Sequence, residues 1–310
     1  MFYTIKTTII KILSKVIIYL METIKYDYKY YKNININGIR NIKIIQFNNN
    51  LIIIGSKVYN EINNKKKYLL YSYLINENFE IIDNSENILN FENIMHDYKN
   101  NIYISCWLRD IYIKNNNYFL LIEFKKNNDD DFFTSTHYLL KTNNFINFEI
   151  HKNYNIKDFF FKDYDNNYFI SKIEKTDHIW GKYLFEFIIN GNKIIPEFDD
   201  IINYNNDYGH VLHNLSYNKD KNEYYIIFSI RHFSENEKNN FYYKIYEAYS
   251  NNLLYYYNTK EINIEFNDNI NSKWYCYPWK FNLNNIEYIV CNTDDYGKYK
   301  NPIIFSKVIK

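Results

Sequence analysis

The feature that most constrains the fold is a sequence pattern that recurs five times in 310 residues. In each copy, a run of β-branched, aliphatic or aromatic residues meets a short turn of Asn, Asp and Lys, and a second such run follows. Two short strands joined by a polar turn form a β-hairpin. The five turns occupy residues 48–50, 115–117, 165–167, 219–222 and 282–285. Their spacing of roughly 50–65 residues is typical of a β-propeller with long outer loops.

The sequence therefore predicts an all-β fold, a five-bladed β-propeller in a single domain. Residues 26–35 alternate and are rich in aromatic side chains, so they could supply a strand that closes the ring. No linker rich in Pro, Gly or Ser divides the chain, which places residues 26–310 in one domain. The predicted blades are residues 38–87, 98–152, 157–199, 209–264 and 274–310.

Residues 1–25 are predicted to be an N-terminal extension, either a short amphipathic helix or a disordered segment. Apolar residues occur there at helical spacing, but Lys6, Lys11 and Lys15 interrupt them. A membrane span needs about 20 nearly uncharged residues, so membrane association is expected only through an amphipathic helix lying on the surface. The alternatives are a helix lying on the domain, a poorly formed secretory signal, or translation upstream of a true start at Met21.

Composition excludes several functional classes. Hydrophobic residues make up 46% and aromatics 20%, which is enough for a packed core. The formal charge of +1 gives no long-range field for phosphate backbones, so nucleic acid is not an expected partner. The three cysteines, Cys106, Cys276 and Cys291, lack CxxC spacing, which argues against a disulfide scaffold and a zinc site. Reduced, buried thiols and a cytosolic setting fit this pattern.

The sequence lacks the motifs of several common enzyme classes. There is no GxSxG nucleophile elbow, no Gly-rich phosphate loop and no HExxH zinc motif. We therefore expect no cofactor and no metal, and we expect the protein to be a monomer.

Several short motifs resemble those of known glycosidases, and they occur in the same order. The run YYIIFSIR at 224–231, followed by YKIYEAYS at 243–250, resembles a blade with "YYLxYSxR" and "YxIGxAxS" strands. Arg109-Asp110-Ile111 before YFLL at 118–121 is similar to an "RDP…YYL" hairpin, and WYCYP at 274–278 with NTDDYG at 292–297 resembles a closing "YPxV…YNGNxYG" blade. The chain after Gly38 thus resembles the five-bladed propeller clan of arabinanases, xylosidases, invertases and fructan-processing enzymes.

The resemblance implies carboxylate chemistry at the centre of the ring. Glycoside hydrolysis needs one acid to protonate the leaving oxygen and one carboxylate as base or nucleophile. In this clan such groups lie near the starts of the inner strands. The corresponding positions here are Arg40-Asn41, Arg109-Asp110, Lys157-Asp158, Gly209-His210 and Tyr277-Pro278.

Two aspartates are the predicted catalytic residues. Asp110 matches the aspartate that, in the resembling enzymes, holds sugar hydroxyls and tunes the acid. Asp158 would act as acid or base if burial near a like charge shifts its pKa. Asp110 could instead be a strand-start aspartate that bonds Arg109 or backbone amides.

Six residues are predicted to bind substrate. Tyr277 and Trp279 are the preferred sugar-stacking pair, although most aromatics in a sheet protein belong to the core. His210 could bind a hydroxyl or a water, or be a satisfied polar histidine, and it should not share an ion with His213 because strand side chains alternate. Arg231 could line the rim or form a surface ion pair. The six residues are Asn41, Arg109, His210, Arg231, Tyr277 and Trp279.

Asn41 decides between two functional hypotheses, an enzyme and a binding protein without catalysis. In the resembling enzymes the first blade supplies an aspartate as base or nucleophile, and an amide can fill neither role. The glutamate expected as the acid is also missing from the inner-strand starts. The first hypothesis is a carbohydrate-active enzyme, hydrolysing or transferring glycosyl groups. The alternative is a glycan-binding or protein-interaction propeller that has lost the catalytic carboxylates.

Overall fold

The computed structural model describes most of the chain after residue 26. The described residues are 27–62, 65–94, 104–126, 135–154, 160–164, 167–174, 182–189, 192–194, 197–199, 210–218, 220–233, 241–264, 274–295, 298–299 and 301–308. They form 22 strands, and none of them is helical. The predicted extension and the Met21 start lie outside these ranges. Because none of the described residues is helical, they include no helix that could span a membrane.

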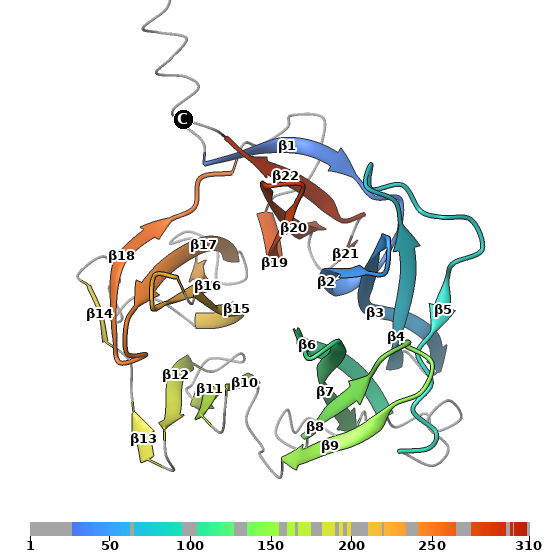
Figure 1. Ribbon diagram of the computed structural model, residues 1–310, viewed down its shortest axis with the longest axis horizontal. Helices are drawn as coiled ribbons and strands as arrows, with labels where there is room; N and C mark the ends of the chain where they lie inside the picture. Colours follow the sequence, from blue (N-terminus) through green and yellow to red (C-terminus); the bar gives the residue numbers. More distant parts are fainter. Residues whose placement is uncertain are drawn as a thin grey trace, which may run out of the picture.

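The strands form five sheets arranged as a propeller around a central axis (Figure 1). Sheet 1 contains β2 (Arg40–Phe47), β3 (Asn50–Ile62), β4 (Lys65–Ile75) and β5 (Asn87–Ile88). Sheet 2 contains β6 (Ile104–Lys114), β7 (Asn117–Lys126), β8 (Ser135–Thr142) and β9 (Glu149–Tyr154). Sheet 3 contains β10 (Phe160–Tyr164), β11 (Asn167–Glu174), β12 (Lys182–Ile189) and β13 (Asn192–Ile194).

The last two sheets have five strands each. Sheet 4 contains β15 (His210–Asn218), β16 (Glu223–Phe233), β17 (Phe241–Ser250), β18 (Tyr255–Glu261) and β14 (Glu197–Phe198). Sheet 5 contains β19 (Trp274–Leu283), β20 (Ile286–Asp295), β21 (Lys298–Tyr299), β22 (Ile303–Lys307) and β1 (Tyr28–Asn33). In each sheet the first strand of the hairpin lies nearest the axis, and these inner strands are β2, β6, β10, β15 and β19 (Figure 1).

The predicted hairpins are present, one in each sheet. They join β2 to β3, β6 to β7, β10 to β11, β15 to β16 and β19 to β20. Two of their turns have positive φ at both central residues, at Asn115-Asn116 and at Asn284-Asn285. This conformation suits the twist of paired strands but is open mainly to Gly, Asn and Asp. With only six glycines in the chain, asparagine takes the role of the turn residue.

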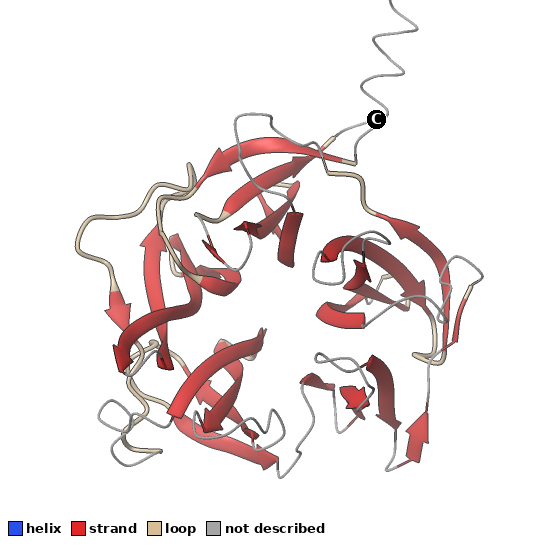
Figure 2. Ribbon diagram, turned by 180° about the vertical axis from the view of Figure 1, so that it is seen from behind, coloured by secondary structure: helices blue, strands red, loops and turns tan. Residues whose placement is uncertain are grey.

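The N-terminal strand closes the ring, as its alternating pattern predicts. β1 pairs antiparallel with β22, so the start and the end of the described chain share sheet 5 (Figures 1 and 2). Asp27 fixes this strand, because its N–H donates to the carbonyl of Asn263 (2.8 Å) and its carbonyl accepts from Val308 (2.9 Å). The closure therefore joins sheet 5 to the segment that follows β18 of sheet 4.

The predicted third blade extends too far along the chain. β14 falls within residues 157–199, yet it pairs in parallel with β18 of sheet 4. Glu197 donates its N–H to the carbonyl of Leu254 (2.7 Å), and Asp199 donates its N–H to that of Tyr256 (3.0 Å). A two-residue strand carries no alternating pattern of its own, so only tertiary pairing assigns it to a sheet.

Apolar side chains fill the spaces between the sheets. One large cluster of isoleucines, leucines and aromatics is drawn from sheets 1, 2 and 5, and a smaller cluster is drawn from sheets 4 and 5. The three cysteines are buried and unbridged, and burial raises the pKa of the Cys291 thiol. These thiols are therefore part of the packing, as expected from their spacing.

Candidate functional site

Four of the inner strands carry a β-bulge near their beginning. The pairing register shifts between Arg40 and Lys43, Leu108 and Asp110, Leu212 and Asn214, and Cys276 and Trp279. A bulge turns a residue out of the regular alternation and re-aims its side chain. Each bulge lies five or six residues before the last residue of its strand, so the four gather at one end of the ring. We call this the bulge end; its bulged residues are Asn41-Ile42, Arg109, His213 and Tyr277-Pro278.

Three of the predicted site residues occupy these bulges. Asn41 (φ 50°) and Tyr277 (φ 52°) adopt the left-handed conformation, which is uncommon for residues other than glycine. Asparagine tolerates it, but for tyrosine it is unfavourable and must be held by the surrounding structure. Such conformations cluster at binding and catalytic sites. Arg109 is the extra residue of the bulge in β6.

Gly55 lies opposite the bulge that contains Asn41. A Cβ atom at this position would lie 2.8 Å from the carbonyl oxygen of Arg40 and 2.6 Å from the side chain of Ile39. Both distances are shorter than van der Waals contact, so the close approach of β2 and β3 requires a glycine here. The bulge that positions Asn41 is therefore built into both strands of the hairpin.

Arg109 and Glu123 form a buried ion pair beside Asp110. Arg109 is 8% exposed and Glu123 of β7 is fully buried. The guanidinium donates from Nε (2.7 Å) and from Nη2 to the same carboxylate oxygen. Asp110, the next residue, is 2% exposed. Charged hydrogen bonds of this kind hold a guanidinium in one orientation, so Arg109 reaches the bulge end as a fixed group.

The sequence analysis did not select Glu123 or His137. Glu123 lies within an otherwise apolar run, YFLLIEF at 118–124, and a charge in a buried strand is itself an indication of a special role. His137 of β8 is paired directly opposite Glu123 and is also buried. Trp107 of β6 is opposite Glu123 on the other side, so the three side chains share one face of sheet 2.

Trp279 is a core residue in this structure. Its indole N–H donates to the carbonyl of Ile44 (3.0 Å), and the Nζ of Lys43 lies 4.5 Å from its ring centroid. It is 5% exposed and ties β19 to β2. Its predicted stacking on a sugar would therefore require the protein to open around it, which makes another aromatic a better candidate.

A more accessible aromatic pair lies where sheets 1 and 2 meet. The rings of Tyr68 and Trp107 are 4.7 Å apart, and the guanidinium of Arg40 lies 4.9 Å from the Tyr68 ring centroid. All three side chains are half-buried. The backbone N–H of Tyr68 donates to the Ser105 hydroxyl (3.1 Å), which links the two sheets. Sequence alone gives no reason to pair two aromatics 39 positions apart.

The remaining predicted residues are only partly placed. Asp158 lies outside the described residues. His210 begins β15 opposite Ile230, and Arg231 lies in β16 opposite Tyr243, but their side chains are not among those described. The bulged histidine of β15 is His213, three residues after the predicted His210. The bulge interrupts the simple alternation on which the prediction for these two histidines rests, so their separation onto opposite faces stays a prediction.

No metal cluster is present in the parts of the chain described here. No three His, Cys, Asp or Glu side chains among these residues lie close enough to hold an ion. The bulge end instead brings together the buried carboxylate of Asp110, the fixed guanidinium of Arg109, the Asn41 amide and aromatic rings. These groups can bond hydroxyls and cover the apolar faces of a sugar ring.

Comparison with known proteins gives a clear result for the structure and none for the sequence. No protein-family model matches the sequence, and no curated protein is similar to it. The structure is similar to a thermostable family-43 glycoside hydrolase, with a TM-score of 0.59, 11% identity, and 90% of this chain and 92% of that one covered.

Two further solved structures with a similar fold are alpha-L-arabinofuranosidases. The GH62 catalytic domain from Coprinopsis cinerea has a TM-score of 0.56 at 9% identity, covering 91% of this chain and 97% of that one. The Podospora anserina enzyme, solved in complex with cellotriose, has a TM-score of 0.55 at 6% identity, covering 92% and 98%. At such identities the likeness is one of fold, and the fold of this chain is that of the glycoside hydrolase propellers.

Proposed function

We propose that this chain is a carbohydrate-active propeller of the glycoside hydrolase type, with its ligand site at the bulge end. In this proposal each of the five sheets is one blade, and residues 26–310 form one domain that acts as a monomer. The observation that carries the proposal is the set of bulges, which brings Asn41, Arg109-Asp110 and Tyr277 to one end of the ring. The carbohydrate-processing neighbours of the same fold support it.

Asp110 and Asp158 would have different roles in the reaction. Asp110 is 2% exposed, so the bulge end would have to open slightly for its carboxylate to accept hydrogen bonds from sugar hydroxyls next to the fixed guanidinium of Arg109. Asp158 would transfer the proton to or from the glycosidic oxygen. It lies six residues before Tyr164 at the end of β10, as Asn41 lies six before Phe47 and Tyr277 six before Leu283. This count would give Asp158 the position in sheet 3 that Asn41 and Tyr277 have in sheets 1 and 5.

The aromatic groups would position the sugar ring. Trp107 and Tyr68 are our preferred stacking surface, because they are half-buried whereas Trp279 is enclosed. Tyr277 would bond or cover the ring from sheet 5. His210, His213 and Arg231 would lie on the side supplied by sheet 4.

The test is an assay against a panel of aryl glycosides and fructans with purified protein. Asp110→Asn and Asp158→Asn are each expected to lower turnover by about 100-fold or more, because proton transfer and its electrostatic support contribute on that scale. Glu149→Gln, an exposed carboxylate on β9 of the same sheet as Asp110, is the matched control and should retain full activity. Turnover that is unchanged in either aspartate variant removes that residue from the mechanism.

A glycan-binding protein without catalysis is the second candidate. Asn41 favours it, because its buried amide occupies the bulge where the resembling enzymes carry an aspartate. An amide can bond a sugar hydroxyl but cannot take its proton. Binding on a glycan array with no hydrolysis of the bound glycans would support this candidate, whereas release of free sugar would exclude it.

A further inference from the structure

A polar cavity lies where sheets 4 and 5 meet, toward the end of the ring opposite the bulge end. Lys221 and Asn285, in the hairpin turns of these two sheets, mark this end. These turns lie about 20 Å of strand beyond the bulges, given six residues at the usual rise. Glu247 lies farther from the turns: through Ile227 it is level with Asn214, next to the bulge of β15 and two strands farther from the axis. The cavity has two adjoining parts of 610 Å³ and 400 Å³, both lined by Lys260 and Lys307. Either part alone lies within the range of about 300–1,000 Å³ that is typical of small-molecule sites.

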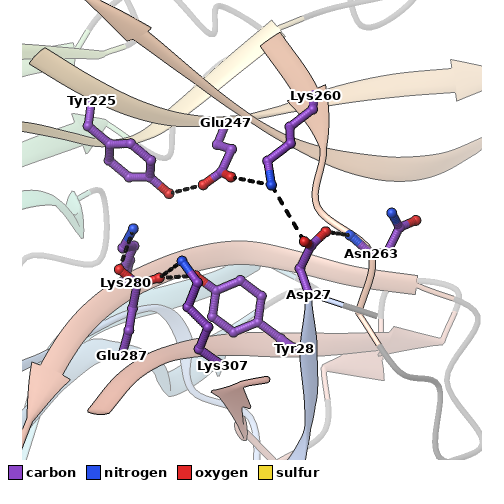
Figure 3. Close-up of polar contacts among 9 residues, drawn as sticks. All are labelled: Asp27, Tyr28, Tyr225, Glu247, Lys260, Asn263, Lys280, Glu287 and Lys307. Carbon is purple, nitrogen blue, oxygen red and sulfur yellow. Dashed lines mark hydrogen bonds and ion pairs between the residues drawn. The ribbon is translucent and has the colours of Figure 1, made fainter. Parts of the chain in front are cut away.

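Sheet 4 supplies one wall of this cavity (Figure 3). Glu247 of β17 accepts a hydrogen bond from the Tyr225 hydroxyl (2.7 Å) and pairs with Lys260 (3.0 Å). Lys260 also reaches Asp27 (3.5 Å), at the start of the closing strand. Glu247 is thereby held in place while its carboxylate faces the cavity.

Sheet 5 supplies the other wall. Glu287 accepts a hydrogen bond from Tyr28 (2.6 Å) and pairs with Lys280 and Lys307 at 2.6 Å each (Figure 3). Burial alone would raise the pKa of Glu287, but these three partners outweigh it and the pKa is lowered. Glu287 is therefore ionised near neutral pH, and both walls present fixed acceptors beside ammonium donors.

Several groups around the larger cavity still have hydrogen-bonding capacity. Among the described residues, no partner accepts from or donates to the side chains of Tyr249, Asn258 and Lys221, or the Thr259 hydroxyl. Burial, together with Glu247, Glu287 and Glu223, raises the pKa of Tyr249. Its hydroxyl therefore stays protonated and is available as a donor within the cavity.

We propose that this cavity is a binding site for a neutral saccharide. The two parts are lined by Lys221, Lys260 and Lys307 against Asp27, Glu223, Glu247 and Glu287, and Lys280 behind Glu287 balances the charge. Balanced charge favours neither a polyanion nor a polycation. A sugar hydroxyl, in contrast, can donate to a carboxylate and accept from an ammonium at once, and the Tyr249 ring offers an apolar face. The site is independent of the activity proposed for the bulge end.

The experiment is calorimetric titration of the full chain with four trisaccharides: arabinotriose, xylotriose, cellotriose and kestose. We expect at least one of the four to bind. The double variant Tyr249→Phe/Lys221→Met removes the Tyr249 hydroxyl and the Lys221 ammonium, and it should weaken binding about tenfold or more. Tyr255→Phe, at an exposed tyrosine of β18 that does not line the cavity, is the matched control and should bind like wild type.

Asp110→Asn separates this site from the bulge end. Saccharide binding that persists in Asp110→Asn and is lost in Tyr249→Phe/Lys221→Met supports the second site, whether or not the chain has glycosidase activity. Three results would overturn it: no heat of binding from any of the four sugars, binding unaffected by the cavity variants, or binding abolished by Asp110→Asn alone. Lys221→Met by itself changes only an exposed turn residue, so an effect of this variant cannot come from misfolding.

Discussion

The buried pair of Arg109 and Glu123 shows how single side chains determine the chemistry available at the bulge end. Taking two charges out of water is costly, and the cost is recovered only when the partners are well placed. Here both N–H groups go to one carboxylate oxygen, with Asp110 as the next residue in the chain. Glu123 is therefore a positioning residue for Arg109 in the proposed site.

Replacing Glu123 tests this pair. Glu123→Gln leaves the guanidinium buried without its carboxylate, so we expect a loss of about 3–5 kcal/mol in the free energy of unfolding, measured by urea denaturation. Arg109→Met/Glu123→Leu should recover most of that loss, because apolar groups of similar size need no charge partner. Glu149→Gln, from an exposed pair with Lys141, should leave the midpoint unchanged. If Glu123→Gln is as stable as wild type, the ion pair with Arg109 does not contribute to the stability of the fold.

The hairpin turns depend on the backbone conformation that asparagine tolerates. A two-residue turn with positive φ at both positions needs residues that tolerate the left-handed conformation. In a chain with six glycines, Asn115-Asn116 and Asn284-Asn285 meet that need. The same conformation appears at Asn41 in the bulge, so one residue type serves both the ends of hairpins and the site.

A turn variant checks this account. Asn116 has φ 59° and its side chain makes no hydrogen bond among the described residues, so its replacement reports on the backbone. Asn116→Ala is expected to destabilise the protein by about 1–2 kcal/mol, the usual penalty of a Cβ in this conformation. Asn116→Gly should be as stable as wild type or slightly more stable. Thermal melts compare the two variants. Equal melting temperatures for Asn116→Ala and Asn116→Gly would show that residue 116 does not have a positive φ.

The ring as a whole depends on the strand at its N-terminal end. β1 completes sheet 5, Tyr28 is 1% exposed, and Asp27 connects the end of sheet 4 to sheet 5. Without β1, the edge of β22 would be open to pairing with another chain. The closure also builds one wall of the cavity between sheets 4 and 5, so the same strand contributes to stability and to the proposed saccharide site.

Truncation separates the closing strand from the residues before it. A chain that starts at residue 26 is expected to melt like the full-length protein, consistent with a domain of residues 26–310. A chain that starts at residue 34 should melt at a lower temperature and elute partly as oligomers from a size-exclusion column, because β22 loses its partner. Identical behaviour of the two truncated proteins would show that β1 does not close the ring.

The sequence by itself determined the local architecture: the hairpins, their asparagine turns, the closing strand and the all-β class. These follow from alternation and turn chemistry within a few neighbouring residues. The catalytic pair Asp110 and Asp158 and the identity of the ligand remain predictions. Only the tertiary structure decided that Glu123 holds Arg109, that His213 rather than His210 lies in the bulge, and that Trp279 is enclosed.

The physical reason is that a bulge shifts the alternation by one residue, and a contact between sheets joins residues far apart in the chain. Neither the bulge nor the contact between sheets can be predicted from the hydrophobic pattern of a single strand. β14 shows the same limit, because two residues carry too little pattern to indicate that they belong to sheet 4. The cavity between sheets 4 and 5 also exists only because strands from both ends of the chain meet there.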